Sequence, residues 1–345
     1  MRRILILLAA GLAALFSASS ALADQGQDLA LAAGRPLVGT LAPRLKLKTV
    51  DGRTVDLGRL YGHKAVYLKF WATWCVPCRQ QMPHLEHTYR TAGSDLEVIA
   101  VNTGFNDSLD RIRDYRRKLN LTVPMAMDDG RLAAALNLRV TPQHVVIGRD
   151  GRILYVGHLA DASLDQALRA ARSTATAPYA PAAGGAPKAI AHYGPGDRLP
   201  QLTPKTLDGA PFAIGDAASG RKTVLVFLSP WCESYLATSL PKAAQACAAA
   251  REQAETLAHN PHIRVLGVAS GLWATRDDLT DYRKRYGVTI PLTLDESGEL
   301  FRGFRVNAVP TLVAADARGR ITRRINGSAA GLAQQIAALS KPGEP

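Results

Sequence analysis

The feature that most constrains this chain is an internal repeat. Short matches recur in the same order in both halves of the 345 residues, first at an offset of 157 positions and later at 167 and 168. The matches include Asp51-Gly52 with Asp208-Gly209, Trp74-Cys75 with Trp231-Cys232, Asp114-Tyr115-Arg116 with Asp281-Tyr282-Arg283, Thr122 with Thr289, and Pro142 with Pro310. Self-similarity on this scale predicts one domain of about 140 residues that has been duplicated.

The composition is that of ordinary globular domains. A chain that is 47% hydrophobic and 21% charged is not a disordered one, and 20 prolines and 29 glycines without a period exclude a fibrous protein. Four cysteines are too few for a scaffold made of disulfides. The net charge of +13 is scattered along the chain rather than gathered on one basic helix, so we predict no nucleic-acid partner.

The first 23 residues have the pattern of a cleaved signal peptide. Arg2 and Arg3 are followed by an uncharged run of 13 residues over 4–16, and Ala21-Leu22-Ala23 has the form of a cleavage site. A membrane-spanning helix needs roughly 20 apolar residues, so a removed leader is favoured over an anchor. No cysteine lies near the cleavage point, which excludes a lipid-anchored lipoprotein. The pattern predicts export, with the periplasm as the location.

The repeat and the composition together predict two α/β domains. The first is expected over 35–172 and the second over 192–341, joined by a linker at 173–191 that is rich in Ala, Pro and Gly. In each copy, apolar strands alternate with amphipathic helices and a hairpin closes the domain. In the first copy we expect strands at 65–70 and 96–101, helices at 75–92 and 109–119, and a hairpin over 145–156. This order predicts a mixed central sheet flanked by helices.

The most informative motif is the C-x-x-C pair formed by Cys75 and Cys78. Residues three apart on a helix lie close enough for a disulfide, and a helix N-terminus favours the thiolate of Cys75. Cys75 is therefore the candidate nucleophile and Cys78 the candidate resolving thiol. Pro83 is expected to kink the following helix. Half of a zinc site and a purely structural disulfide are the alternatives, although no second cysteine pair completes a zinc site.

The segment FWATWCVPCRQQMPHLE, the later Thr141-Pro142 and the hairpin around Asp150-Gly151 resemble the periplasmic TlpA/ResA-like thiol:disulfide oxidoreductases. This family lies within the redoxin/AhpC-TSA-like superfamily. The resemblance implies a thioredoxin-like fold for each copy and an oxidoreductase that needs no cofactor and no metal. It also implies that Pro142 is cis and faces Cys75. The Thr141 backbone would then bind an extended substrate strand, and Trp74 would flank the reactive sulfur.

One residue departs from the thioredoxin pattern. Lys69 stands where thioredoxins proper have a buried carboxylate, just before Phe70-Trp71. A lysine beside a buried Cys78 would stabilise its thiolate and alter proton transfer. The favoured expectation is that the stem of Lys69 packs in the strand while its amine reaches solvent.

The second copy lacks the local partner for its cysteine. Cys232 aligns with the nucleophile, but Tyr235 stands at the resolving position. Cys247 lies 15 residues further on, and one continuous helix would place it about 22 Å away. A Cys232–Cys247 disulfide is therefore not expected unless the helix breaks near Pro241, and Cys247 is expected to be a small buried side chain.

The role of Cys232 stays open between three interpretations. Cys232 is a thiol that forms mixed disulfides with a partner, a peroxide-reactive thiol, or a remnant in a docking domain. Val309-Pro310 keeps the cis-proline signature of the first copy, so the groove beside Cys232 is a candidate second site.

The function that these features favour is reduction of protein disulfides in the periplasm through Cys75 and Cys78. The expected partners are protein disulfide substrates and a membrane thiol donor that restores the dithiol. A peroxiredoxin-like antioxidant protein and a non-catalytic module for partner docking or metal delivery remain the alternatives. Removal of Cys78 separates them, since an enzyme loses turnover while a docking module keeps its partner.

Overall fold

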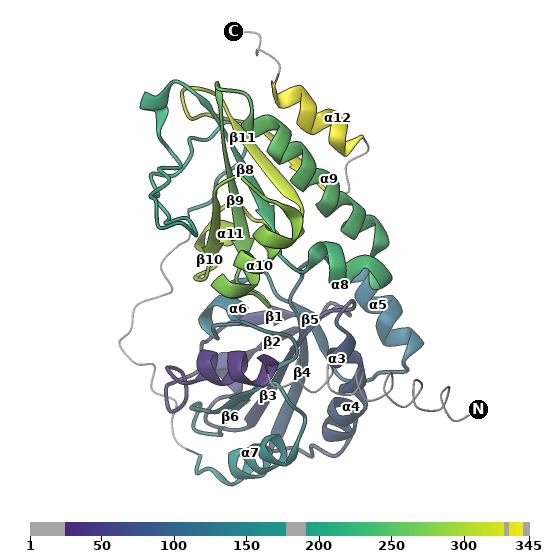
Figure 1. The fold of residues 1–345 in the computed structure, drawn as a ribbon. Helices are drawn as coiled ribbons and strands as arrows, with labels where there is room; N and C mark the ends of the chain where they lie inside the picture. Colours follow the sequence, from purple (N-terminus) through teal and green to yellow (C-terminus); the bar gives the residue numbers. More distant parts are fainter. Residues whose placement is uncertain (1–24, 177–190, 328–330, 341–345) are drawn as a thin grey trace, which may run out of the picture. The chain divides into compact units, whose positions relative to one another are not determined.

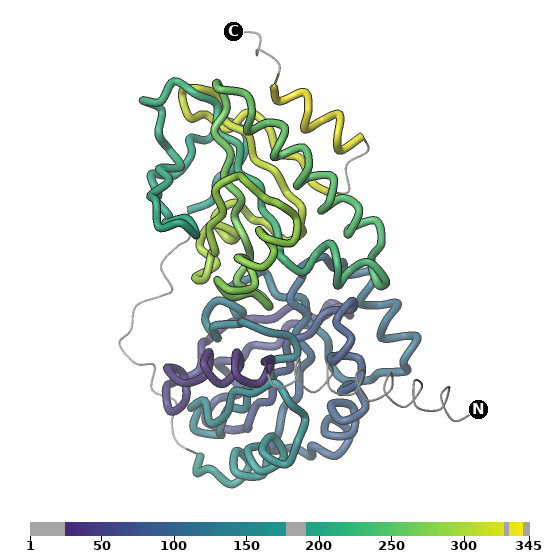
Figure 2. The backbone as a smooth tube through the Cα atoms, in the orientation of Figure 1, coloured from purple at the N-terminus to yellow at the C-terminus, as the bar shows by residue number. Residues whose placement is uncertain are grey.

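A computed structural model describes residues 25–176, 191–327 and 331–340 of the chain. The described chain divides into two compact units (Figures 1 and 2): residues 25–104 with 108–176, and residues 105–107 with those described from 191 onward. Each unit is built around its own five-stranded sheet (Figure 1). The predicted signal peptide, 1–23, lies outside the described residues, as do 177–190 of the predicted linker. In the part of the chain that is described, no helix is both long and apolar enough to cross a membrane.

The sheet of the first unit is mixed, with its longest strands at the centre and next to it. Its order is β5-β4-β3-β6-β7, in which β3, β4 and β5 are parallel while β6 and β7 run antiparallel to their neighbours. The strands are β3 (Ala65–Trp71), β4 (Leu96–Asn102), β5 (Met125–Met127), β6 (Gln143–Ile147) and β7 (Ile153–Gly157). A short antiparallel pair, β1 (Lys46–Lys48) and β2 (Thr54–Asp56), precedes them.

Six helices of the first unit connect or flank these strands. They are α2 (Leu57–Leu60), α3 (Val76–Gln80), α4 (Met82–Arg90), α5 (Leu109–Lys118), α6 (Arg131–Ala135) and α7 (Ala162–Ser173). Residues 25–34 are also helical, ahead of the predicted domain start at 35. The helix expected over 75–92 is two helices, because the backbone leaves helical geometry at Gln81 and Pro83 falls in the first turn of α4, where no N–H is needed.

The second unit repeats the same sheet. Its order is β10-β9-β8-β11-β12, again with three parallel strands followed by two antiparallel ones. The strands are β8 (Lys222–Leu228), β9 (Ile263–Ser270), β10 (Leu292–Asp295), β11 (Thr311–Ala315) and β12 (Ile321–Asn326). Its helical segments are η1 (Ala217–Ser219), α8 (Cys232–Ser239), α9 (Pro241–Ala258), α10 (Arg276–Tyr286), α11 (Glu299–Gly303), α12 (Leu332–Ala337) and η2 (Ala338–Ser340). The change of the repeat offset from 157 to 167 falls where this copy has the longer α9, which has 18 residues against nine in α4.

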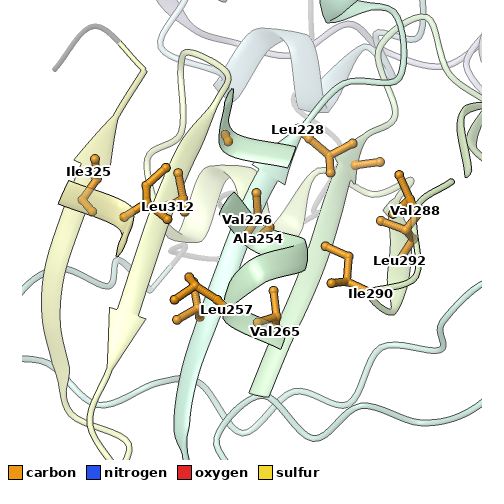
Figure 3. Packing of buried hydrophobic residues seen from close by; sticks show 14 of the residues in the cluster. Val226, Leu228, Ala254, Leu257, Val265, Val288, Ile290, Leu292, Leu312 and Ile325 are labelled. Carbon is orange, nitrogen blue, oxygen red and sulfur yellow. The ribbon is translucent and has the colours of Figure 1, made fainter. Parts of the chain in front are cut away.

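Strand alternation sorts each sheet into two faces. In β3, Val66, Leu68 and Phe70 join one apolar cluster, so Tyr67 and Lys69 point to the opposite face. In β8, Val224, Val226 and Leu228 face a cluster formed with α9, α10 and α12 (Figure 3). The small alanines of α9 allow this helix to lie close against the sheet, which explains the alanine-rich run of the sequence.

A glutamate carboxylate supports the same turn in both units. In the first, Glu86 of α4 accepts hydrogen bonds from the backbone N–H groups of Thr122 and Val123, ahead of β5. In the second, Glu255 of α9 accepts from the N–H groups of Thr289 and Ile290, ahead of β10. Burial raises the pKa of Glu86, but hydrogen bonds from Thr122, Val123 and Arg90 outweigh it and leave that pKa lowered.

We predict that Glu86→Ala loosens the turn ahead of β5 far more than Glu255→Ala loosens its counterpart. Glu86 is buried, so its loss leaves the N–H of the fully buried Val123 without its acceptor, at a cost of about 2 kcal/mol. Glu255 is partly exposed, and water can replace it. Amide hydrogen exchange at residues 122–123 and 289–290 measures both effects, and equal loss of protection would contradict the prediction. Because the pKa of Glu86 is lowered on folding, its stabilisation is lost as the pH falls through that pKa.

Candidate active site

Cys75 and Cys78 lie at the carboxyl end of the central strand β3. Cys75 is the N-cap of α3, and its Sγ accepts a hydrogen bond from the Cys78 backbone N–H at 3.2 Å. The two cysteines form a disulfide with their Cα atoms 5.2 Å apart. Both side chains are almost fully buried. The N–H of Cys78 thus points at the sulfur on which a thiolate charge would develop.

The cis-proline segment expected from the resemblance lies beside this sulfur. The Thr141-Pro142 peptide bond is cis, and Cys75 Sγ lies 3.4 Å from the Thr141 carbonyl oxygen. Thr141 is fully buried, and Trp74, which precedes the nucleophile candidate, is 3% exposed. The structure therefore brings Trp74, Cys75, Cys78, Thr141 and Pro142 into one place.

Lys69 does not behave as expected, since its amine does not reach solvent. The side chain is 0% exposed, and its Nζ donates a hydrogen bond of 3.4 Å to the Cys78 carbonyl oxygen. The alternation of β3 turns Lys69 toward α3, and the sheet covers it from behind. Burial lowers the pKa of Lys69 from 10.5 to about 7.

A buried polar network lies around Lys69 and was not predicted. His144 is the cross-strand partner of Lys69 in β6; the Tyr67 hydroxyl donates to its Nδ1 at 2.8 Å, and its Nε2 donates to Gln81 Oε1 at 2.8 Å. His158 Nδ1 donates to the Pro142 carbonyl oxygen at 2.7 Å. These contacts connect the strand, the helix break and the cis-proline. The sequence signal was a histidine two positions after Pro142, directly ahead of the apolar run Val145-Val146-Ile147.

Both histidines are neutral at physiological pH. Burial, and then the neighbouring Lys69 charge, lower the pKa of His144 well below its usual value. Burial also lowers the pKa of His158. Lys69 is thus the group of this network that is partly protonated and partly neutral near pH 7.

The second-copy site differs from the expectation, because Cys232 and Cys247 form a disulfide. The distance of about 22 Å assumed one continuous helix. Instead the chain leaves helical geometry at Leu240, with φ −141° and ψ 62°, and Pro241 begins α9. The break at Leu240 lets α8 pack against α9 and brings the Cα atoms of Cys232 and Cys247 to 6.3 Å from each other. Cys232 is therefore not an unpaired thiol, and Cys247 is not merely a small buried side chain.

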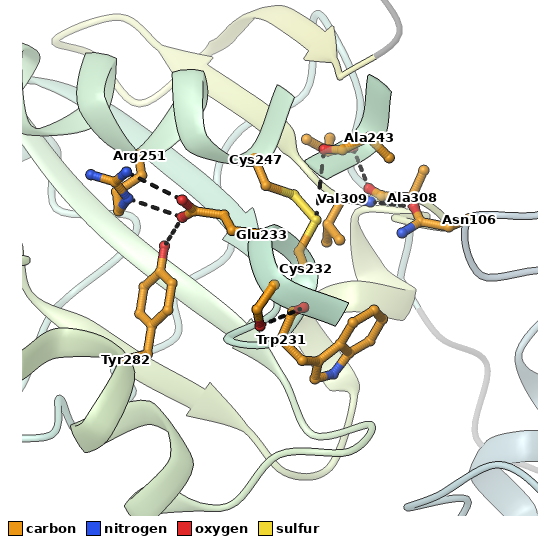
Figure 4. The surroundings of a disulfide bond; sticks show 12 residues. Asn106, Trp231, Cys232, Glu233, Ala243, Cys247, Arg251, Tyr282, Ala308 and Val309 are labelled. Atoms are coloured by element: carbon orange, nitrogen blue, oxygen red, sulfur yellow. Dashed lines mark hydrogen bonds and ion pairs between the residues drawn. A yellow bond between two sulfur atoms is a disulfide. The ribbon is translucent and has the colours of Figure 1, made fainter. Parts of the chain in front are cut away.

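The second unit keeps the cis-proline that its sequence indicated. The Val309-Pro310 peptide bond is cis, and both residues are buried. Cys232 begins α8 after Trp231, and its Sγ lies 3.8 Å from the Ala243 carbonyl oxygen (Figure 4). Within the described residues, no group of three or more His, Cys, Asp and Glu side chains is placed to hold a metal ion.

Comparisons with known proteins agree with this geometry. The AhpC/TSA family model matches residues 38–156, and the Redoxin model matches residues 194–337. The thioredoxin-like protein YneN of Bacillus subtilis is 35% identical over 133 residues, which are 38% of this chain and 78% of that protein. The thiol-disulfide oxidoreductase ResA of the same organism is 29% identical over 120 residues, 34% of this chain and 65% of ResA. The chain belongs to the thioredoxin-like thiol–disulfide oxidoreductases.

For this thioredoxin-like oxidoreductase, the expected fold class of two tandem thioredoxin-like α/β folds is confirmed. Among solved structures, a thiol:disulfide interchange protein of the thioredoxin family from Chlorobium tepidum is 27% identical. The match covers 39% of this chain and 97% of that protein, with a TM-score of 0.36.

We predict that Lys69→Met stabilises the oxidised protein at neutral pH. Between pH 7 and 10.5 the unfolded chain binds a proton that the folded protein does not, so the stability of the natural protein rises with pH across this window. The methionine variant lacks this penalty and gains on the order of 3 kcal/mol near pH 6. The gain shrinks toward pH 10.5.

Urea unfolding at pH 6, 8 and 10 measures this effect. The matched control is Lys64→Met, because Lys64 is partly exposed and pairs with Glu97 at 3.3 Å. A gain for Lys69→Met of the same size at pH 6 and pH 10 would show that burial of the amine carries no protonation penalty.

Proposed function

We propose that this oxidoreductase reduces disulfides of proteins in the periplasm through the Cys75–Cys78 couple. The single observation that carries the proposal is the placement of the Cys75 sulfur. It lies 3.4 Å from the Thr141 carbonyl oxygen of the cis-proline segment and 3.2 Å from the Cys78 N–H. The pattern of a leader over 1–23 supports export.

The reaction follows from the order of the two thiols. The Cys75 thiolate attacks one sulfur of the substrate disulfide, which breaks and leaves Cys75 bonded to that sulfur. The Cys78 thiolate then attacks Cys75, releases the substrate as a dithiol and restores the Cys75–Cys78 disulfide seen here. Two electrons pass to the substrate, and a membrane thiol donor must return them before the next turnover.

Individual residues have separate parts in this scheme. The Thr141 backbone binds an extended substrate segment, and Trp74 flanks the sulfur. Lys69, with its Nζ 3.4 Å from the Cys78 carbonyl oxygen, supplies positive charge when Cys78 becomes a thiolate and gives up a proton when the disulfide forms again. A group with a pKa of about 7 can do both near neutral pH.

We predict that both cysteine variants lose turnover, but that only one of them traps the substrate, when the reduced protein is offered insulin as a disulfide substrate. Cys75→Ser loses turnover by at least about 100-fold because the attacking sulfur is gone. Cys78→Ser also loses turnover, but accumulates a covalent mixed disulfide with the substrate, visible by non-reducing mass spectrometry. Gln80→Ser, an exposed change on the same helix, keeps full turnover. Trapping by Cys75→Ser instead of Cys78→Ser would reverse the assigned roles.

The direction of the reaction is tested by the midpoint potential of the Cys75–Cys78 couple. We expect a value near that of cytosolic thioredoxin, about −270 mV, because Pro77 precedes Cys78 and the family resemblance favours reduction. Titration in thiol buffers followed by mass-shift alkylation gives the value. A potential near about −120 mV belongs to an oxidant and would reverse the direction.

A further inference from the structure

We propose that the second unit holds a second redox centre, in which the Cys232–Cys247 disulfide opens and closes reversibly as a two-electron couple. Its co-reactant is a dithiol, either on a protein or on a small molecule. This inference goes beyond the chemistry proposed for Cys75 and Cys78 and does not depend on it.

The position of Cys232 is the first observation. Cys232 follows a tryptophan after the central strand β8 and is the first residue of α8, while Cys75 follows a tryptophan after β3 and is the N-cap of α3. The cis-proline Pro310 stands directly before β11, the antiparallel neighbour of β8. The second unit therefore keeps the thiol position and the cis-proline, and takes its partner sulfur from α9 instead of from the next turn (Figure 4).

Burial does not mark this bond as merely structural. Cys232 is 0% exposed and Cys247 is 7% exposed, against 1% for Cys75 and 0% for Cys78. Taken as a pair, the residues of the second disulfide are no less exposed than those of the C-x-x-C motif. Cys247 is the more exposed residue of the pair and lines the adjacent cavity, so its sulfur is assigned as the one that an incoming thiolate attacks.

A small cavity beside the bond gives the freed sulfur room. It measures about 10 Å³, space for about one water molecule, and Cys247, Pro310 and Ser229 all line it. Non-bonded heavy atoms need roughly 3.5–4 Å of separation, so opening a disulfide requires free volume next to it. Ser229 is 2% exposed, and its hydroxyl finds no hydrogen-bond partner among the described residues. This hydroxyl is available to the reduced sulfur.

The helices around the bond are held together without it. The Glu233 carboxylate accepts hydrogen bonds from Arg251 at 2.9 and 3.2 Å and one from the Tyr282 hydroxyl at 3.2 Å (Figure 4). These contacts join α8, α9 and α10, one residue from Cys232 and one helical turn from Cys247. The second unit is therefore built to stay folded when the disulfide opens.

Reduction of the Cys232–Cys247 disulfide takes two thiol–disulfide exchanges. A donor thiolate attacks Cys247, the Cys232–Cys247 bond breaks, and a mixed disulfide forms between the donor and Cys247. Cys232 leaves as a thiolate at the first residue of α8, where the helix N-terminus favours negative charge. The second donor thiol attacks the mixed disulfide and frees Cys247. The donor becomes a disulfide, and two electrons and two protons have passed to the unit.

The test uses the full chain with Cys75→Ser and Cys78→Ser, so that one couple remains. The protein is equilibrated in buffers of reduced and oxidised dithiothreitol and then alkylated for mass analysis. We expect the thiols of Cys232 and Cys247 to appear together in reduced dithiothreitol and to disappear together in oxidised dithiothreitol. The circular dichroism spectrum of the protein should be the same in both buffers. A bond that opens only in denaturant, or whose opening unfolds the unit, would overturn the proposal. Neither outcome depends on turnover at Cys75 and Cys78.

Ser229→Ala tests the part given to the cavity. Loss of one hydrogen bond to the reduced sulfur should lower the equilibrium constant for reduction about fivefold. Ser234→Ala, at an exposed serine of α8, should leave the equilibrium constant within about twofold and serves as the matched control. Equal constants for the two variants would overturn the role given to Ser229.

Discussion

Both cysteine sites depend on the antiparallel pairing of the central strand with its neighbour. In the first unit Phe70 of β3 pairs with Gln143 of β6, so the residue just before β6, Pro142, meets the end of β3 where Cys75 follows. In the second unit Phe227 pairs with Thr311 in the same way, directly after Pro310. Antiparallel pairing puts the start of β6 or β11 at the carboxyl end of the central strand, whereas parallel pairing would put it at the opposite edge of the sheet. This single antiparallel pairing therefore places a cis-proline beside each cysteine.

The residues behind the two disulfides differ in polarity, most directly at one shared position of the repeat. Lys69 and Val226 occupy the same position in the repeat, and both point to the helix-covered face of their sheets. The first site therefore has a buried amine next to Cys78, and the second has an apolar wall that also lines the cavity at Cys247. A cation stabilises a thiolate and so favours the reduced state, whereas an apolar wall does not. The two couples are thus expected to differ in potential although their folds are alike.

The limits of prediction from the sequence follow from the range of the interactions involved. The C-x-x-C geometry depends on one helical turn, and the sheets follow from strand and helix periodicity, so these features could be predicted. The burial of Lys69 could not be predicted, because it depends on how α3 covers β3 and how β6 pairs beside it. The residue types of β3 alone do not show whether the amine reaches solvent. The Cys232–Cys247 bond depends on the backbone at Leu240, where Pro241 allowed a break but local propensity favoured one long helix.

The source of the second sulfur also changes what each disulfide requires of its fold. Cys78 stays near Cys75 wherever the short helix α3 forms, since three residues separate them. Cys247 is 15 residues from Cys232 and stays near it only while α9 packs on the sheet and Arg251 holds Glu233. A longer loop is costlier to close in an unfolded chain. In the second unit, thiol chemistry is therefore linked to tertiary packing, whereas in the first unit it is linked to a single turn of helix.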